Sequence, residues 1–237
     1  MKKTYNIFNA LLIVAILIGD VLYILKGTLL IKSITSAGFV ILGGINLWYV
    51  FKHQPHHKKL AIVKVLGLFF AMLGDILLEI HFITGALLFA VGHVFYFFAY
   101  SCIIPFKPKD LLYGAAIFVP SVLFITLAPI FDFGGIVMEI VCVVYAIIIS
   151  CMVGKAISNV VQAKTIINIV ILVGSCLFFF SDLMLLLNVF GDMPRIVGIL
   201  CLATYYPAEC VLAYSLLCTD KQEEKQEENQ AEQSTQV

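Results

Sequence analysis

Long apolar runs alternate with short polar segments along the chain as far as about residue 218. About 20 apolar residues are enough to cross a bilayer as an α-helix. With that length, the pattern predicts spans at about 5–25, 30–51, 60–80, 83–104, 111–130, 134–154, 164–188 and 196–218. The runs are continuous rather than alternating, which argues against a β-barrel. The pattern therefore predicts an all-α fold, a polytopic membrane bundle of eight transmembrane helices over residues 1–218.

Composition supports this class of protein. Of the 237 residues, 62% are hydrophobic and only 13% are charged, whereas a soluble domain is about 45–50% apolar. One soluble core cannot bury that excess, so we expect an integral, multi-pass membrane protein, in a plasma membrane of the bacterial type. Residues 219–237 are rich in Gln, Glu and Lys and lack an apolar face, which predicts a disordered, polar cytoplasmic tail.

The distribution of basic residues predicts the orientation of the bundle. With eight spans both termini lie on one side, and cytoplasmic segments carry the excess of Lys and Arg. Twelve of the fifteen basic residues fall on the side of the termini, and only Lys26, Lys32 and Arg195 fall on the other. Both termini are therefore expected to be cytoplasmic.

Three of the spans that run outward carry a small residue followed by an aspartate. The pairs are Gly19-Asp20, Gly74-Asp75 and Ser181-Asp182. Asp75 lies fifteen residues beyond Leu60, or about 22 Å into the membrane at the helical rise. An ionisable group at such depth is costly and marks a functional site by default, and a small residue beside it lets a neighbouring helix approach.

The inward-running spans add polar groups at a similar depth. His93, Tyr96 and Tyr100 share one helical face, and Tyr205, Tyr206 and Glu209 are grouped in the last span. Together with the aspartates they predict an acidic, aromatic cavity in the outer half of the bundle. A packing role fits His93 equally well, and Glu79 and Glu139 are also compatible with positions at the membrane interface.

At these residues the sequence resembles the YhhN-like lysoplasmalogenase family, which includes the vertebrate transmembrane lysoplasmalogenases. The resemblance covers roughly residues 28–218, and Gly74 to Tyr96 is its most specific part. The matching motifs are Lys32-Ser33-Ile34-Thr35, Gly74-Asp75-Ile76-Leu77-Leu78 with Gly85, Phe89, His93 and Tyr96, Ser181-Asp182-Leu183, and Thr204-Tyr205-Tyr206 with Ala208. This chain departs from the family pattern at Ser33, where proline is typical, and at Glu209, where glutamine is typical.

The resemblance implies a hydrolase of the vinyl-ether bond of lysoplasmalogen, a membrane lysophospholipid, which releases a fatty aldehyde and a glycerophospho-headgroup. Such cleavage needs an acid that protonates the β-carbon and a carboxylate that stabilises the resulting cation, as in glycosidases. We assign these roles to Asp75 and Asp182, expected close enough to share a proton. His93 and Tyr96 would orient them, Lys32 would contact the lipid phosphate, and Tyr205, Tyr206 and Glu209 would line the pocket.

Other interpretations stay open from the sequence. Asp and His could together bind zinc, but acid-catalysed cleavage of a vinyl ether needs no metal, so neither a metal nor another cofactor is expected. A proton-coupled transporter or lipid-handling protein could use the same intramembrane acids; the three aspartates lie on helices that run in one direction, so no inverted repeat supports it. No nucleic-acid partner is expected, and assembly into a homo-oligomer is compatible with the sequence.

Overall fold

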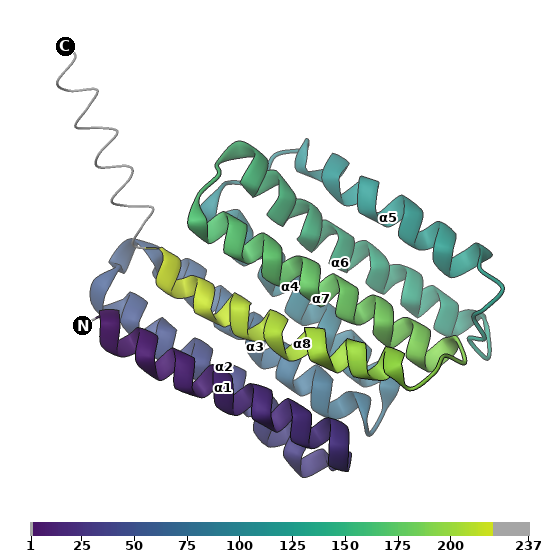
Figure 1. The fold of residues 1–237 in the computed structure, drawn as a ribbon. Helices are drawn as coiled ribbons and strands as arrows, with labels where there is room; N and C mark the ends of the chain where they lie inside the picture. The colour runs from purple at the N-terminus through teal and green to yellow at the C-terminus, as the bar shows by residue number, and fades with distance from the viewer. Residues whose placement is uncertain (1, 220–237) are drawn as a thin grey trace.

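The protein is a bundle of α-helices in the computed structural model, which describes residues 2–219 (Figure 1). The expected tail therefore lies outside the described residues, apart from Thr219. Eight α-helices and two short 3₁₀ helices make up the described part. They are α1 (Lys2–Lys26), α2 (Leu29–His53), η1 (Pro55–His57), α3 (Lys58–Leu78), α4 (Phe82–Ile103), α5 (Asp110–Leu127), α6 (Ile136–Gln162), α7 (Ile166–Phe190), α8 (Ile196–Tyr214) and η2 (Ser215–Cys218).

All eight α-helices are long and apolar enough to cross a membrane, as the hydrophobic pattern predicted. The all-α class and the number of spans are thus confirmed for the described residues. The sixth helix extends eight residues beyond its predicted end at residue 154, because Lys155 is buried within it rather than placed in a connecting loop. Pro120 does not end the fifth helix, which continues to Leu127.

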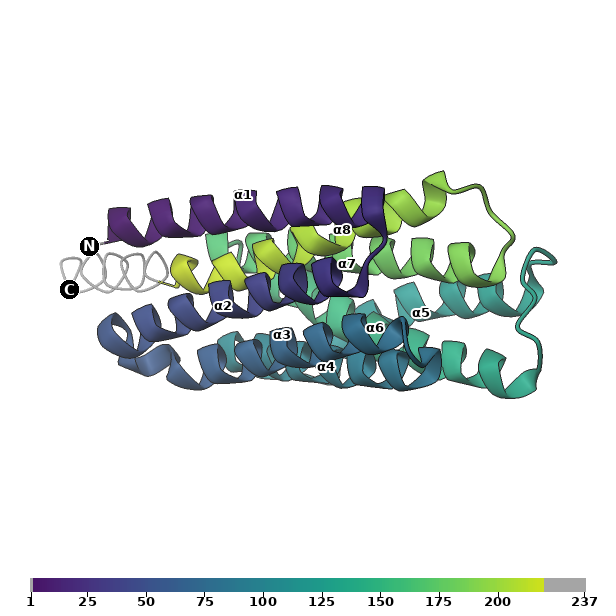
Figure 2. The ribbon, with the colours of Figure 1, turned by 90° about the horizontal axis from the view of Figure 1, so that it is seen from below.

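The helices run alternately up and down, and most pack against their neighbours in the sequence. The start of α1 and the end of α8 lie at the same end of the bundle (Figure 2); we call this the termini end and the opposite one the far end. Helix α5 forms one edge, and α1 and α2 form the opposite edge (Figure 1). Among the described helices, α3 packs on α2, α4 and α8, whereas α7 packs on α6 and α8.

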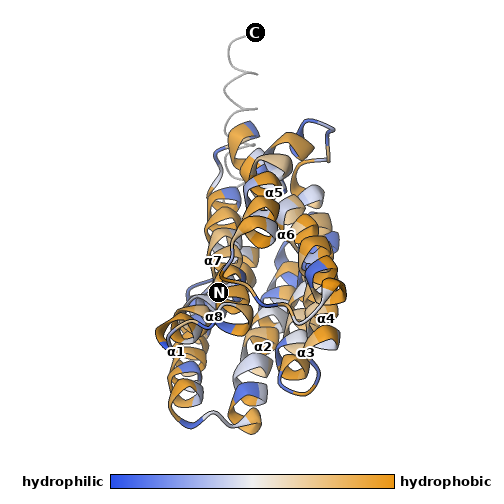
Figure 3. Cartoon of the chain, turned by 90° about the vertical axis from the view of Figure 1, so that its right-hand side faces the viewer, coloured by the Kyte–Doolittle hydropathy of each residue, from blue (hydrophilic) through white to orange (hydrophobic). Residues whose placement is uncertain are grey.

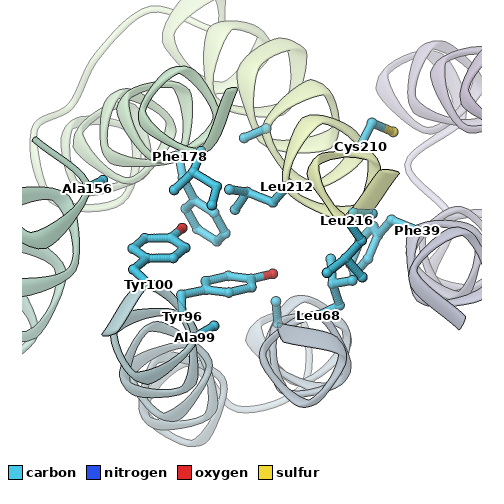
Figure 4. Close-up of a cluster of buried hydrophobic side chains, with 14 of the residues drawn as sticks. Phe39, Leu68, Tyr96, Ala99, Tyr100, Ala156, Phe178, Cys210, Leu212 and Leu216 are labelled. Carbon is cyan, nitrogen blue, oxygen red and sulfur yellow. The ribbon is translucent and has the colours of Figure 1, made fainter. Parts of the chain in front are cut away.

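The surface of the bundle is apolar along the helices, and hydrophilic residues gather toward their ends and connections (Figure 3). Large side chains such as Leu11, Trp48 and Leu112 are 64%, 67% and 70% exposed. An apolar belt of this kind suits hydrocarbon rather than water. The interior holds aromatic side chains, and Tyr96, Tyr100 and Phe178 lie close together at its centre (Figure 4).

A buried ion pair joins α5 to α6 near the termini end. Lys155 Nζ lies 2.7 Å from Asp110 Oδ2, and both side chains are almost completely buried. Ser158 donates a hydrogen bond to Asp110 Oδ1 at 2.6 Å, and the backbone N–H of Lys107 donates one to Oδ2 at 3.0 Å. The carboxylate is thereby compensated, which explains how α6 carries a charged residue so far along its buried face.

Candidate functional site

Two separate hydrogen-bond networks surround the predicted aspartates. The first, the Asp75 network, consists of Asp75, Lys32, Ser36 and Tyr206. Ser36 donates to Asp75 Oδ2 at 2.5 Å and Tyr206 donates to the same oxygen at 3.0 Å, while Lys32 Nζ lies 3.1 Å from Oδ1. All four side chains are buried, so helices α2, α3 and α8 enclose a charged group that is fully partnered.

Lys32 also pairs with Glu79, at the far end of α3. Its Nζ lies 2.8 Å from Glu79 Oε1, which also accepts a hydrogen bond from Tyr23 at 2.6 Å. Lys32 is thus held between two carboxylates and is only 5% exposed. The sequence suggested a contact between Lys32 and a lipid phosphate, but the structure places the lysine where it neutralises acids of the site.

Glu79 lies just outside the membrane-spanning segments and is half-exposed. Burial raises its pKa, but the hydrogen bonds from Lys32 and Tyr23 and the charge of Lys32 outweigh burial, so the pKa lies below the ordinary 4.5. A lowered pKa in the folded state means that the ionised form stabilises the fold. This stabilisation is complete above the unfolded-state value and is lost as the pH falls through the folded-state value.

We therefore expect Glu79→Gln to reduce stability at pH 7 and to make little difference near pH 3. Because Glu79 is 43% exposed and solvent screens such pairs, the reduction at pH 7 should be under about 1 kcal/mol. Thermal unfolding in one detergent across this pH range measures it, with Glu139→Gln in the first turn of α6 as the matched control. A difference that stays constant or grows toward acid pH would contradict the role given to this pair.

The second network, the Asp182 network, consists of Asp182, His93 and Tyr145 from α7, α4 and α6. Tyr145 donates a hydrogen bond to Asp182 Oδ2 at 2.7 Å, and His93 Nε2 lies 3.2 Å from the same oxygen and 2.8 Å from the Tyr145 hydroxyl. The Tyr145 hydroxyl uses its proton to donate to Asp182. With a proton on Nε2, His93 can therefore donate to both the Asp182 Oδ2 and the Tyr145 hydroxyl oxygen. Its Nδ1 is buried and has no hydrogen-bond partner among the described residues.

The two aspartates do not hydrogen-bond to each other, because α3 and α7 both pack on α8 rather than closely on one another. Glu209 of α8 interacts electrostatically with both. Tyr96 donates a hydrogen bond to Glu209 Oε2 at 2.5 Å, whereas Oε1 has no hydrogen-bond partner in the described part of the chain. The three acids therefore have separate hydrogen-bond partners, and the two predicted aspartates do not form a single hydrogen-bonded pair.

Aromatic rings fill the space between the two networks. The Phe178 ring contacts those of His93 and Tyr205, with centroids 4.6 Å and 5.5 Å apart. The Tyr205 ring contacts that of Tyr206, with centroids 4.9 Å apart. Tyr205 and Tyr206 thus connect the two halves of the site by packing, as well as through the hydroxyl of Tyr206.

Two of the small residues that precede the aspartates, Gly19 and Gly74, lie where a neighbouring helix comes close. A Cβ added to Gly74 would lie 2.8 Å from the Phe89 ring of α4, and one added to Gly19 would lie 2.5 Å from Thr35 Oγ1 of α2. These close approaches bring the helices together beside the acids. Asp20 is consequently buried and interacts electrostatically with Asp75, so the first two of the three aspartates share one side of the site.

An apolar cavity of about 480 Å³ borders the Asp182 network. It lies between α4, α5, α6 and α7 and reaches the end of α3. Asp182 and Tyr145 line it, together with residues that are otherwise almost all apolar, and Asp75 is not part of its wall. Its volume is typical of a site for a small molecule. Asp182 is therefore the carboxylate that a molecule in the cavity can reach.

Sequence reasoning missed Ser36 and Tyr145. Ser36 lies one turn after Lys32 on the same face of α2, a spacing that could have indicated its place in the site. Tyr145 is an isolated hydroxyl in an apolar stretch of α6, where Glu139 was the polar residue considered instead. Among the described residues, no cluster of three or more His, Cys, Asp or Glu side chains could hold a metal ion.

Fold and site together define a polytopic helical membrane protein with buried carboxylate networks beside an apolar cavity. The chain belongs to the YhhN family, whose family model matches residues 28–216. The resemblance seen in the motifs is thereby confirmed, and at the level of the family this is a lysoplasmalogenase-like membrane protein. Comparison with curated proteins and with solved structures found no match.

Proposed function

We propose that the protein is an integral membrane hydrolase that cleaves the vinyl-ether bond of lysoplasmalogen-type lysophospholipids. The products are a fatty aldehyde and a glycerophospho-headgroup. The observation that carries the proposal is the position of Asp182, a carboxylate within the membrane that is hydrogen-bonded to Tyr145 and His93 and borders an apolar cavity. Family membership supports the same class of reaction.

In the proposed mechanism Asp182, as the acid, gives its proton to the β-carbon of the vinyl ether. The electrons of the double bond form the new C–H bond, and an oxocarbenium ion remains. A water molecule adds to the cationic carbon and returns its proton to Asp182, the acid of the first step now acting as the base. The hemiacetal then collapses: the bond to the glycerol oxygen breaks, that oxygen takes the hydroxyl proton, and the aldehyde is released.

The other acids support this step through their charge. Asp75, the second carboxylate of the proposal, would act as an anion that pairs with Lys32 and accepts hydrogen bonds from Ser36 and Tyr206. Because Lys32 is shared between Asp75 and Glu79, the cluster keeps a net negative charge when both carboxylates are ionised, and such a fixed charge stabilises a cation without reorganising solvent. Asp75 would thus favour the oxocarbenium ion from its own side of the bundle, while His93 and Tyr145 position Asp182.

The test is an assay of purified, detergent-solubilised protein with three lysolipids that differ only in the bond to the chain: vinyl ether, saturated ether and ester. Aldehyde should form from the vinyl ether alone, and in D₂O it should carry one deuteron on carbon 2, because that carbon receives the proton. A transporter would release no product in solution. Absence of aldehyde, or aldehyde without the deuteron, would overturn the proposed reaction.

Tyr145→Phe should lower kcat about 10- to 100-fold with little change in thermal stability. The replacement removes one hydroxyl, which both donates to Asp182 and lies within hydrogen-bond distance of His93, and general acid–base steps depend on such positioning. Aldehyde release at saturating vinyl-ether lysolipid measures the effect, with Tyr214→Phe at the end of α8 as the matched control. An unchanged rate would remove the hydroxyl from the mechanism.

A further inference from the structure

The cavity beside Asp182 has a chemical character that identifies its occupant. Its walls are formed by apolar side chains such as Phe82, Phe124 and Phe190, while Asp182 and Tyr145 bring their polar groups to it from one side. A phosphate or an ammonium group in the apolar part would lie without hydrogen-bond partners, at high cost. We propose that this cavity binds the hydrocarbon chain of the lipid, so that the first carbons of the chain meet Asp182. For the identity of the lipid, this inference rests on the proposed function.

The position of Asp182 along the cavity supports this assignment. On α7 the wall extends from Phe179 to Phe190, and Asp182 lies three residues from the first and eight from the second, or about 4.5 Å and 12 Å at the helical rise. The longer, far-end side of the cavity is thus available to a chain. In a vinyl-ether lysolipid the double bond joins the first two carbons of that chain. A chain seated in the cavity therefore brings its reactive carbons to the one carboxylate in the wall.

The preference for one hydrocarbon chain over another must depend on the space inside the cavity rather than on the hydrophobic effect. The lysolipid comes from a bilayer or micelle in which its chain is already in hydrocarbon, so entering the protein gains little from the hydrophobic effect. Fit to the cavity walls then decides, through close packing. The walls are widened by small side chains, Ala86 of α4 and Ala116 of α5. A larger side chain at either position would narrow the space that is available to a chain.

Helix α5 carries a matched pair of positions for a test. Both Ala115 and Ala116 are exposed, but Ala116 lines the cavity and Ala115 is not part of its wall. Phenylalanine at residue 116 would occupy cavity space, and the same residue at 115 would point to the membrane side. Ala86→Phe fills the cavity from α4 and keeps the test informative if Ala116→Phe does not fold.

The experiment uses a saturated 1-O-alkyl lysophospholipid with a photoreactive diazirine at the end of its chain, which contains no vinyl ether to cleave. After irradiation of the full-length protein in detergent, the labelled residues are mapped by mass spectrometry. Label should concentrate on the cavity walls of α4 to α7, and an excess of the same lipid without the diazirine should remove it. Ala116→Phe and Ala86→Phe should each reduce labelling at least tenfold, and Ala115→Phe should leave it within about twofold.

Two results would overturn the inference. One is label that spreads over lipid-facing residues, such as Leu11 of α1, and does not respond to the competitor. The other is equal labelling of the wall-filling variants and of Ala115→Phe. Aldehyde release from the vinyl-ether lipid, measured in parallel, separates the two proposals. Labelling that the competitor removes, without aldehyde, supports the chain site and rejects the reaction. Aldehyde without such labelling supports the reaction and rejects the chain site.

Discussion

Asp182→Asn is expected to lower the rate of aldehyde release about 10³-fold while the protein stays folded. The amide has the size of the carboxyl group and can still accept the hydrogen bond that Tyr145 donates at 2.7 Å, but it cannot give or take the proton that the reaction moves. Positioned acids and bases contribute about 10²- to 10⁴-fold to such steps. The measurement is kcat for vinyl-ether lysolipid with purified protein, alongside thermal unfolding.

The matched control is Asp192→Asn, which makes the same chemical change in the exposed connection between α7 and α8 and should leave kcat unchanged. Asp75→Asn should also reduce kcat, because a negative charge that favours the developing cation is lost, but photolabelling of the cavity should persist since Asp75 is not in its wall. Full activity of Asp182→Asn would rule out the mechanism, whatever Asp75→Asn shows. Full activity of Asp75→Asn alone would restrict the chemistry to the Asp182 network.

The sequence predicted the spans well because each helix had to satisfy one simple constraint, an apolar stretch of membrane length. It failed at the end of α6 for a physical reason. Lys155 looked like the start of a loop because a lone charge does not continue a membrane helix, but Asp110, 45 residues earlier, neutralises it. A residue's charge can be read from sequence, whereas the partner that cancels it cannot.

The acids of the site could be predicted together with some of their partners, Lys32, His93 and Tyr206, but Ser36 and Tyr145 could not. The depth of Asp75 and Asp182 follows from counting residues along a helix, and their cost in hydrocarbon made them candidates. Which side chains surround them depends on contacts such as Ser36 with Asp75 and Tyr145 with Asp182, between helices distant in sequence. The separation of the two aspartates likewise follows from helix packing, since α3 and α7 both pack on α8 rather than closely on one another.

The carboxylates that pair with Lys32 change the role that its sequence position had suggested. As an isolated cation near the far end of the bundle, it looked suited to a phosphate. Its Nζ lies 3.1 Å from Asp75 Oδ1 and 2.8 Å from Glu79 Oε1, so it holds acidic groups in place. In the proposed mechanism Lys32 therefore favours the ionised form of Asp75 instead of contacting the lipid. The orientation of the termini stays a prediction. Two of the twelve basic residues that were counted on the side of the termini, Lys64 and Lys155, are buried in helices.

The largest effect on stability is expected from Lys155→Met. The replacement has a similar length and suits the apolar surroundings, but it leaves Asp110 without its cation in a position that is only 4% exposed. Breaking a buried ion pair by removing one partner costs about 3–5 kcal/mol, which for a domain of this size corresponds to a lowering of Tm by about 10 °C. Thermal unfolding in a single detergent at neutral pH measures the change.

Two further variants show whether the unpaired carboxylate is the cause. Lys109→Met changes an exposed lysine just before α5 and should shift Tm by no more than about 1–2 °C, as is usual for surface positions. The double variant Asp110→Leu/Lys155→Met removes both charges and should recover much of the loss, because an apolar pair of similar volume often replaces a buried ion pair at little cost. If the double variant is as unstable as Lys155→Met alone, the unpaired charge is not the cause, and the damage comes from lost packing or from the hydrogen bonds that Ser158 and the Lys107 N–H donate to Asp110.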